Sequence, residues 1–159
     1  MAISQDEIIR LAELLGKIDQ PKNGLPQPVF DSLVKIVPFV ACELIIEGED
    51  GYLMTWREDE FFKGWHFPGG LLRYSEEFDD RIQKTAQKEL GVMIKNYRLI
   101  LTKNYPRSSR GHGVCFIFLC TINEIPKDGE YFKEMPEDII KEHRLLWGEI
   151  ANYKKYAVK

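Results

Sequence analysis

The sequence has little cysteine, little net charge and no long hydrophobic run. Its three cysteines, Cys42, Cys115 and Cys120, are odd in number and lie in apolar segments. This excludes a disulfide framework or a zinc site and predicts buried thiols in a reducing compartment. A formal net charge of −3 gives no general attraction to nucleic acid or to a membrane surface.

No apolar run approaches the roughly 20 residues that a membrane-spanning helix needs. The N-terminal segment 1–10 is acidic and amphipathic, unlike a secretory signal. We therefore expect a cytoplasmic protein with no membrane partner and no nucleic-acid partner.

A helix is predicted close to the N-terminus, over residues 4–18. Ser4 and Glu7 have the spacing of a capping box, in which each residue satisfies a backbone amide of the other. Apolar residues follow at helical spacing and predict one buried stripe, formed by Ile8, Leu11, Leu15 and Ile18.

Length and composition fit one globular domain, 1–159. The 159 residues are 44% hydrophobic and 12% aromatic, enough for a single core. Residues 19–28 contain three prolines and a glycine and are predicted to form a loop. We therefore divide the domain into an N-terminal helical extension, 1–27, and a core, 28–159.

The core is predicted to be an α+β fold, with a mixed sheet covered by helices. Branched and aromatic residues predict strands at 39–47, 52–57, 97–103 and 114–122, of which the last is nearly all apolar and therefore central. Asp50-Gly51 is a hairpin signal between the first two strands. The other expected elements are a short helix at 29–37, an extended piece at 65–67, loops at 58–64, 103–113 and 124–136, an extended segment at 141–147, and a closing helix at 148–156.

Segment 64–92 is the stretch around which the chain is organised. Ser75 is predicted to cap a helix over 76–90, and Gly91 to end it in the left-handed conformation. At about 100° per residue, one face of this helix collects four apolar side chains, and Glu89 falls inside the same sector. The four are Phe78, Ile82, Ala86 and Leu90.

A carboxylate in an apolar sector needs a partner, because burial of an unpaired charge costs several kcal/mol. Glu89 therefore has two interpretations: a salt bridge near the helix end, or a ligand of a hard cation such as magnesium. The glycine pair Gly69-Gly70 also has two interpretations. It forms either a simple turn or a loop whose backbone carbonyl binds the same cation as Glu89.

With these residues in view, the chain resembles the Nudix hydrolase family, whose box reads G-x5-E-x7-R-E-U-x-E-E-x-G-U with U a bulky aliphatic residue. Gly70, Glu76, Glu89 and Gly91 occupy their box positions. Three charged box positions have changed and now hold Lys84, Thr85 and Lys88. Lys84 replaces the box arginine, and Thr85 and Lys88 replace two box glutamates. The loss of these two glutamates resembles the GDP-mannose mannosyl hydrolase branch.

The resemblance implies a Nudix-type α/β/α sandwich with a mixed central sheet and, here, an added N-terminal helix. It implies a homodimer and one magnesium ion, with manganese as the alternative cation. By position, the metal ligands are Gly69, through its backbone oxygen, Glu89 and Glu142. His143 matches the general base that activates water.

The resemblance also implies residues that bind the diphosphate leaving group. Arg57 matches an arginine that steadies it, and Lys84 shares the work of the box arginine as a point charge. Tyr105, Arg107 and Arg110 lie in one basic loop that either binds an anionic substrate or is simply solvated.

The predicted activity is magnesium-dependent hydrolysis of a small-molecule nucleoside diphosphate sugar, with water attacking the anomeric carbon. Two alternatives stay open: ordinary Nudix cleavage between phosphates, and a nucleotide-binding domain without catalysis. His66 is expected to pack or to face the sheet, and His112 is expected to lie exposed. Phe61 and Phe62 are expected to stack on a base or to pack at a dimer interface.

Overall fold

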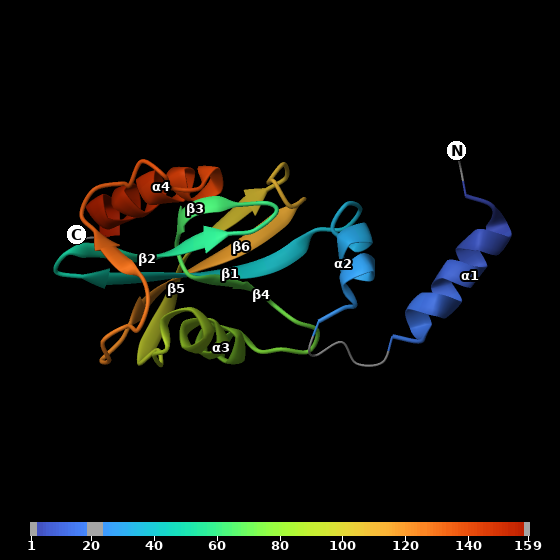
Figure 1. Cartoon of the computed structure of the whole chain (residues 1–159), viewed down its shortest axis with the longest axis horizontal. Helices are drawn as coiled ribbons and strands as arrows, with labels where there is room; N and C mark the ends of the chain where they lie inside the picture. Colours follow the sequence, from blue (N-terminus) through green and yellow to red (C-terminus); the bar gives the residue numbers. More distant parts are fainter. Residues whose placement is uncertain (1–2, 19–23, 158–159) are drawn as a thin grey trace.

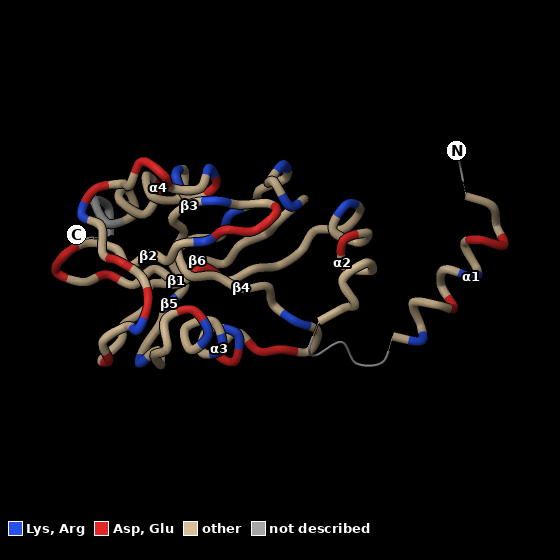
Figure 2. The backbone as a smooth tube through the Cα atoms, viewed as in Figure 1, with Lys and Arg blue, Asp and Glu red and all other residues tan. Residues whose placement is uncertain are grey.

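The computed structural model describes residues 3–18 and 24–157 and is a layered α/β/α sandwich with a helix standing beside it (Figure 1). No helix among these residues has the length and apolar character needed to cross a membrane. Charged residues of both signs are spread over the helices and loops (Figure 2). The elements are α1 (Gln5–Gly16), α2 (Gln27–Leu33), β1 (Phe39–Gly48), β2 (Gly51–Glu58), β3 (Lys63–His66), β4 (Gly69–Leu71), α3 (Phe78–Leu90), β5 (Asn96–Tyr105), β6 (Gly113–Thr121), β7 (Glu130–Phe132) and α4 (Lys141–Ala157).

The sheet is mixed, as predicted. Its strand order is β3-β2-β1-β6-β5, and the β1–β6 pair is parallel while the other pairs are antiparallel. The apolar strand β6 lies between β1 and β5, so its predicted central position is confirmed. β1 pairs with β2 only next to the turn, where Glu47 faces Tyr52 and Gly48 faces Gly51. Earlier in β1, Ala41–Glu43 pairs with β4 instead. The sheet therefore opens between β1 and β2.

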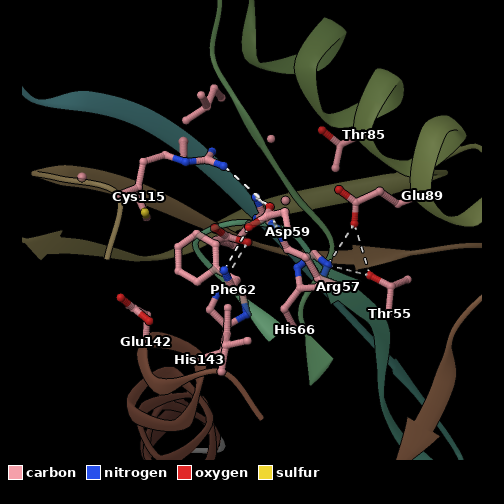
Figure 3. A pocket seen from close by; sticks show the side chains of 18 of the residues that line it. Thr55, Arg57, Asp59, Phe62, His66, Thr85, Glu89, Cys115, Glu142 and His143 are labelled. Atoms are coloured by element: carbon pink, nitrogen blue, oxygen red, sulfur yellow. Dashed lines mark hydrogen bonds and ion pairs between the residues drawn. The ribbon is translucent and has the colours of Figure 1, made fainter. Parts of the chain in front are cut away.

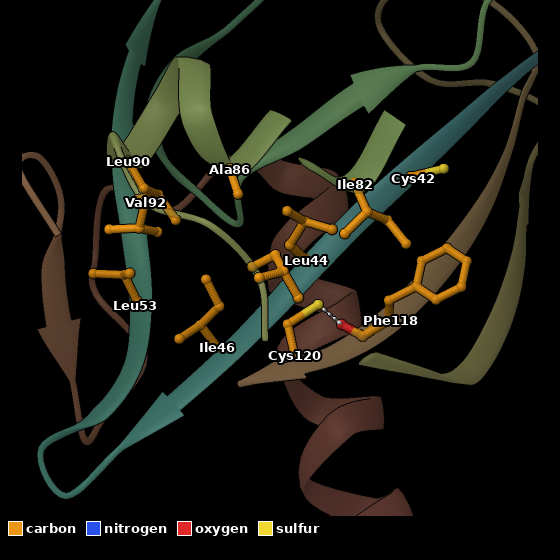
Figure 4. Packing of buried hydrophobic residues seen from close by; sticks show 11 residues of the cluster. Cys42, Leu44, Ile46, Leu53, Ile82, Ala86, Leu90, Val92, Phe118 and Cys120 are labelled. Atoms are coloured by element: carbon orange, nitrogen blue, oxygen red, sulfur yellow. Dashed lines mark hydrogen bonds between the residues drawn. The ribbon is translucent and has the colours of Figure 1, made fainter. Parts of the chain in front are cut away.

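The two faces of β1 serve two different cores. Alternate residues Cys42, Leu44 and Ile46 pack against α3 (Figure 4). Ala41 and Ile45 point to the other face and belong to the core that contains Leu146 and Ile150 of α4. Because side chains alternate along a strand, Glu43 projects to the α4 face, between apolar neighbours in the middle of β1.

The N-terminal helix forms as predicted, but its buried stripe is wrong. The capping box is present, with the Ser4 backbone N–H donating to Glu7 at 2.7 Å and the Glu7 N–H donating to the Ser4 hydroxyl at 3.3 Å. Ile8, Leu11 and Leu15 are nevertheless between 37% and 49% exposed, because α1 stands away from the sheet (Figure 1). Within the described residues no side chain of α1 is buried.

The start of α3 differs from its prediction. Glu77 is the N-cap residue, without a side-chain capping bond, and Ser75 adopts a positive φ of 54°. Glu76 fixes this turn, because its carboxylate accepts from the Arg73 backbone N–H at 2.9 Å and from Arg81 at 2.6 Å. The C-terminal end is as predicted, since Gly91 has a φ of 67°.

The C-terminal segment is helical where an extended segment was expected. Residues 141–147 form the first two turns of α4, since His143, Leu146 and Ile150 recur at helical spacing and are buried together. The strands β4 and β7 lie within segments expected to be loops, and α2 begins two residues before the predicted 29. The β1–β2 hairpin and the strands β5 and β6 form where they were predicted. The three cysteines are buried and free, as predicted.

Candidate functional site

A cleft of about 580 Å³ lies where β1 parts from β2 (Figure 3). It is lined by β1 to β4, by α3, by the start of α4 and by the segment around Ser108 and Arg110 between β5 and β6. Two groups of lining side chains differ in charge, and we call them the carboxylate end and the arginine end. The carboxylate end comprises Glu43, Thr55, His66, Glu89 and His143, and the arginine end comprises Arg57, Asp59, Phe62 and Arg110.

Two carboxylates from different elements share the carboxylate end. Glu89 accepts hydrogen bonds from the Thr55 hydroxyl at 3.2 Å and from the Gly69 backbone. Burial, followed by the negative charge of Glu43, raises the pKa of Glu89 to about 7. Oε2 of Glu43 is buried and, among the described residues, has no hydrogen-bond partner. A Cβ at Gly69 would meet this oxygen, so any side chain there would displace the Glu43 carboxylate.

This donor set fits a divalent cation. Magnesium takes oxygen ligands, often one or two protein carboxylates, and keeps several waters. Glu89 and Glu43 supply two carboxylates, and an unpartnered buried oxygen is the group that a cation stabilises. The described residues hold no cluster of three or more His, Cys, Asp or Glu side chains suited to a metal. The fit is therefore to a cation with few protein ligands.

Within the cleft, the His143 ring lies next to the Glu43 carboxylate. The Phe67 backbone N–H donates to Nδ1 of His143 at 2.8 Å, and Nε2 lies 3.7 Å from Oε2 of Glu43. Since Nδ1 accepts, the proton of the neutral imidazole resides on Nε2. His143 therefore presents a proton, and Glu43 presents the free lone pairs.

His66 is buried in the sheet, as expected, but it also lines the cleft. Nε2 of His66 lies 3.1 Å from the Thr55 hydroxyl and 3.7 Å from Oε2 of Glu89. Burial, then the charges of His143 and Arg57, lower the pKa of His66 to about 3, so the ring is neutral near pH 7.

The arginine end carries more positive than negative charge. Asp59 accepts from Nε of Arg57 at 2.6 Å and lies 3.8 Å from the Arg110 guanidinium, so two cations share one carboxylate. Arg57 also lies 4.7 Å over the Phe62 ring, and Arg110 lies 5.1 Å over Phe61. Nε of Arg110 is buried without a partner in the described chain. This end suits an anionic group next to a flat ring.

The structure places the remaining predicted residues differently. Lys84 lines the cleft, but its ammonium is 2.9 Å from Glu76, whose carboxylate also binds Arg81. Glu142 lines the α4 side of the cleft (Figure 3), and its carboxylate accepts from the Ser109 backbone N–H at 3.0 Å. Glu142 is thus not brought to Glu89.

Of the three predicted residues in the basic loop, two line the cleft. The Tyr105 hydroxyl is buried there without a partner in the described chain, and burial raises its pKa. Arg110 belongs to the arginine end. Arg107 is not among the lining residues and instead borders a separate hollow with His112, which contacts Asn104 at 2.7 Å.

Sequence reasoning missed Glu43, Thr55 and Asp59. A signal existed for Glu43, which is a charge flanked on both sides by apolar residues within the strand 39–47. Thr55 and Asp59 gave none, since a threonine in a strand and an aspartate in a loop are ordinary.

Comparisons with known proteins agree with this architecture. The NUDIX domain family matches residues 38–154. A curated relative, the low-salt glycan biosynthesis protein Agl8 of Haloferax volcanii, is 34% identical over 83 residues, which are 52% of this chain and 53% of the relative. The match therefore spans about half the length of that relative.

Solved structures show the same fold at low sequence identity. The MutT NUDIX hydrolase of Burkholderia pseudomallei has a TM-score of 0.62 and 19% identity, covering 72% of this chain and 98% of that one. A putative nudix hydrolase family member of Chromobacterium violaceum has a TM-score of 0.60 and 19% identity, covering 74% and 79%. An ADP-ribose pyrophosphatase of Streptococcus suis has a TM-score of 0.57 and 18% identity, covering 77% of this chain and 94% of that one.

Proposed function

We propose that this chain, which belongs to the NUDIX domain family, is a divalent-metal-dependent hydrolase of a nucleoside diphosphate sugar. The observation that carries the proposal is the polarity of the cleft. One end offers two half-buried carboxylates, and the other offers two guanidinium groups beside an aromatic ring. A sugar diphosphate linked to a nucleoside has a matching order of groups, with the diphosphate between a reacting carbon and a base.

Glu89, with the Gly69 backbone oxygen, is the proposed holder of a magnesium or manganese ion, and Glu43 beside it is the proposed acceptor of the water proton. When bound, such an ion stabilises the negative charge that develops on a departing diphosphate. Thr85 and Lys88 stand where the family box has acids, so these two positions offer no carboxylate for a second or third cation. Glu142, the third ligand implied by sequence, has to leave Ser109 to join this set.

The proposed water activation uses Glu43 and His143 together. A water at the anomeric carbon gives its proton to Glu43, and the water oxygen forms the new bond to carbon. The bond from that carbon to the β-phosphate oxygen breaks, and its electron pair leaves with the nucleoside diphosphate. Nε2–H of His143, 3.7 Å from Glu43, orients the carboxylate during this step. His143 as the base itself stays a prediction.

The arginine end stabilises the leaving group. Arg57 and Arg110 share Asp59, so the pair has an unbalanced positive charge that a phosphate can take up. The Phe62 ring lines the cleft beside them and offers a stacking surface for the base. Tyr105 lines the same cleft and contributes a buried hydroxyl without a partner in the described chain. The relative whose name refers to glycan biosynthesis supports a sugar-containing substrate.

The second candidate is ordinary cleavage between phosphates, which the ADP-ribose pyrophosphatase among the fold neighbours represents. A substrate panel separates the readings. The protein is incubated with magnesium and with nucleoside diphosphate sugars, dinucleotides and nucleoside triphosphates, and the products are resolved. We expect free sugar plus nucleoside diphosphate from one or more nucleotide sugars. Sugar phosphate plus nucleoside monophosphate would favour the second candidate, and saturable binding without turnover would leave a binding domain.

A further inference from the structure

Thr55 and His66 form a hydrogen-bonded pair that ends on Glu89. They face each other in the register of β2 and β3, and both are buried. Oγ1 of Thr55 lies 3.1 Å from Nε2 of His66 and 3.2 Å from Oε2 of Glu89. A single hydroxyl therefore connects an imidazole in β3 with a carboxylate in α3 (Figure 3).

The proton positions along this chain follow from donor counting. As a cation ligand Glu89 is ionised and only accepts, so the one proton of the Thr55 hydroxyl points to Glu89. The hydroxyl oxygen is then free to accept from His66 when the neutral ring carries its proton on Nε2. In that tautomer the hydrogen bonds run from His66 to Thr55 to Glu89.

Glu89 needs such support because of where it lies. It is the second-last residue of α3, two positions before Gly91, which ends the helix. The Thr55 hydroxyl gives the one side-chain hydrogen bond to Glu89 in the described chain, and Gly69 gives a backbone one. Two buried polar side chains at paired sheet positions are costly unless they are satisfied, and here each satisfies the other.

We propose that Thr55 and His66 are positioning residues that hold the Glu89 carboxylate in the orientation in which it receives the cation. This inference rests on Glu89 as a cation ligand in the proposed function. Groups that orient metal ligands typically affect metal affinity by about 10–100-fold. The pair therefore acts on cation binding before it acts on the reaction.

The test measures Mn²⁺ binding to the full chain without substrate, by the loss of the free-ion electron paramagnetic resonance signal. Thr55→Val keeps the shape and removes the hydroxyl, and we expect roughly 10–100-fold weaker binding. Thr55→Ser restores the hydroxyl and should bind as the wild type does. Thr85→Val is the matched control: it removes another buried hydroxyl of the cleft, which has no partner in the described chain, and should leave Mn²⁺ affinity unchanged.

His66 supplies an independent arm if Thr55→Val does not fold. His66→Phe removes the donor and should weaken Mn²⁺ binding by a smaller factor, while His66→Gln keeps an N–H and should restore it. In steady state, Thr55→Val should recover its kcat at saturating magnesium, because the defect lies in affinity.

Three results would overturn the proposal: unchanged Mn²⁺ affinity in both Thr55→Val and His66→Phe, equal weakening in Thr55→Val and Thr85→Val, or no restoration by Thr55→Ser and His66→Gln. Glu89→Gln separates this failure from failure of the proposed function. If Glu89→Gln binds Mn²⁺ as the wild type does, Glu89 is not a ligand. If Glu89→Gln loses Mn²⁺ binding and the Thr55 and His66 variants keep it, Glu89 is a ligand but Thr55 and His66 do not position it.

Discussion

The two ends of the cleft are held in different ways. At the carboxylate end, backbone N–H groups and a buried hydroxyl hold His143 and Glu89, and one oxygen of Glu43 is left without a partner in the described chain. At the arginine end, two guanidiniums share one carboxylate and lie over phenylalanine rings. The Glu43 side chain is 13% exposed and the Arg57 side chain 29%.

This difference separates two tasks. A fixed, desolvated group suits a step in which charge develops at one place, because little reorganisation accompanies it. Charged side chains near solvent that share a partner suit binding, since a phosphate can replace Asp59 without leaving a buried charge unpaired. Variants at the carboxylate end should therefore act on kcat and metal affinity, and variants at the arginine end on KM.

The largest effect is expected for Glu89→Gln. Loss of a cation ligand forfeits several kcal/mol of charge stabilisation, which corresponds to a fall in turnover of roughly a thousandfold. Magnesium-dependent turnover is measured at saturating substrate. Glu134→Gln, an exposed residue that is not among those lining the cleft, serves as the control. Near-normal rates for Glu89→Gln would remove it from the ligand set.

Glu43→Gln and His143→Ala form the next pair. If Glu43 takes the proton from water, Glu43→Gln should lower kcat by roughly a hundredfold or more. His143→Ala should lower kcat by a smaller factor, because Glu43 remains. The order of the two kcat values is the measurement. A larger loss for His143→Ala would return the role of general base to His143.

At the arginine end, Arg110→Ala should raise KM by about tenfold, the effect of a lost charged hydrogen bond of roughly 1.5 kcal/mol, with kcat nearly unchanged. Arg107→Ala removes a charge from the same loop but outside the cleft and should change neither constant. An equal rise in KM for both variants would mean that the loop acts through its overall charge.

The smallest effect concerns stability at the start of α3. Burial alone raises the pKa of Glu76, but hydrogen bonds from Lys84, the Arg73 backbone and Arg81 outweigh it, so its pKa lies below the ordinary value. A lowered folded-state pKa stabilises the fold above the unfolded pKa of about 4.3, and this contribution is lost as pH falls through the folded value. The stability difference between wild type and Glu76→Gln, from urea unfolding, should be present at pH 7 and shrink below about pH 4. A pH-independent difference would contradict this.

Much of the fold was accessible from sequence because it depends on local patterns. Strand composition, the hairpin glycine and the Gly91 stop are local and were predicted correctly. The stripe of α1 was wrong because burial depends on a covering surface that the helix does not reach. The start of α4 was missed because the helical spacing of its buried residues is visible only when His143 is counted with the apolar ones.

The site was only partly accessible for the same reason. Glu89 stood out because helical spacing placed a charge in an apolar sector. Glu43 reaches the same place through the pairing of β1 with β4, a relation between distant segments that sequence spacing does not contain. The partners of Lys84 and Glu142 are likewise set by tertiary contacts, with Glu76 and Ser109.

The measurement that most directly tests the account is the fate of oxygen from labelled water. The protein is run in oxygen-18 water with magnesium and the nucleotide sugar that it turns over fastest, and both products are analysed by mass spectrometry. Attack at the anomeric carbon, with Glu43 and Glu89 at the reacting end, predicts label in the released sugar alone. Label in a phosphate product would contradict it and establish attack at phosphorus.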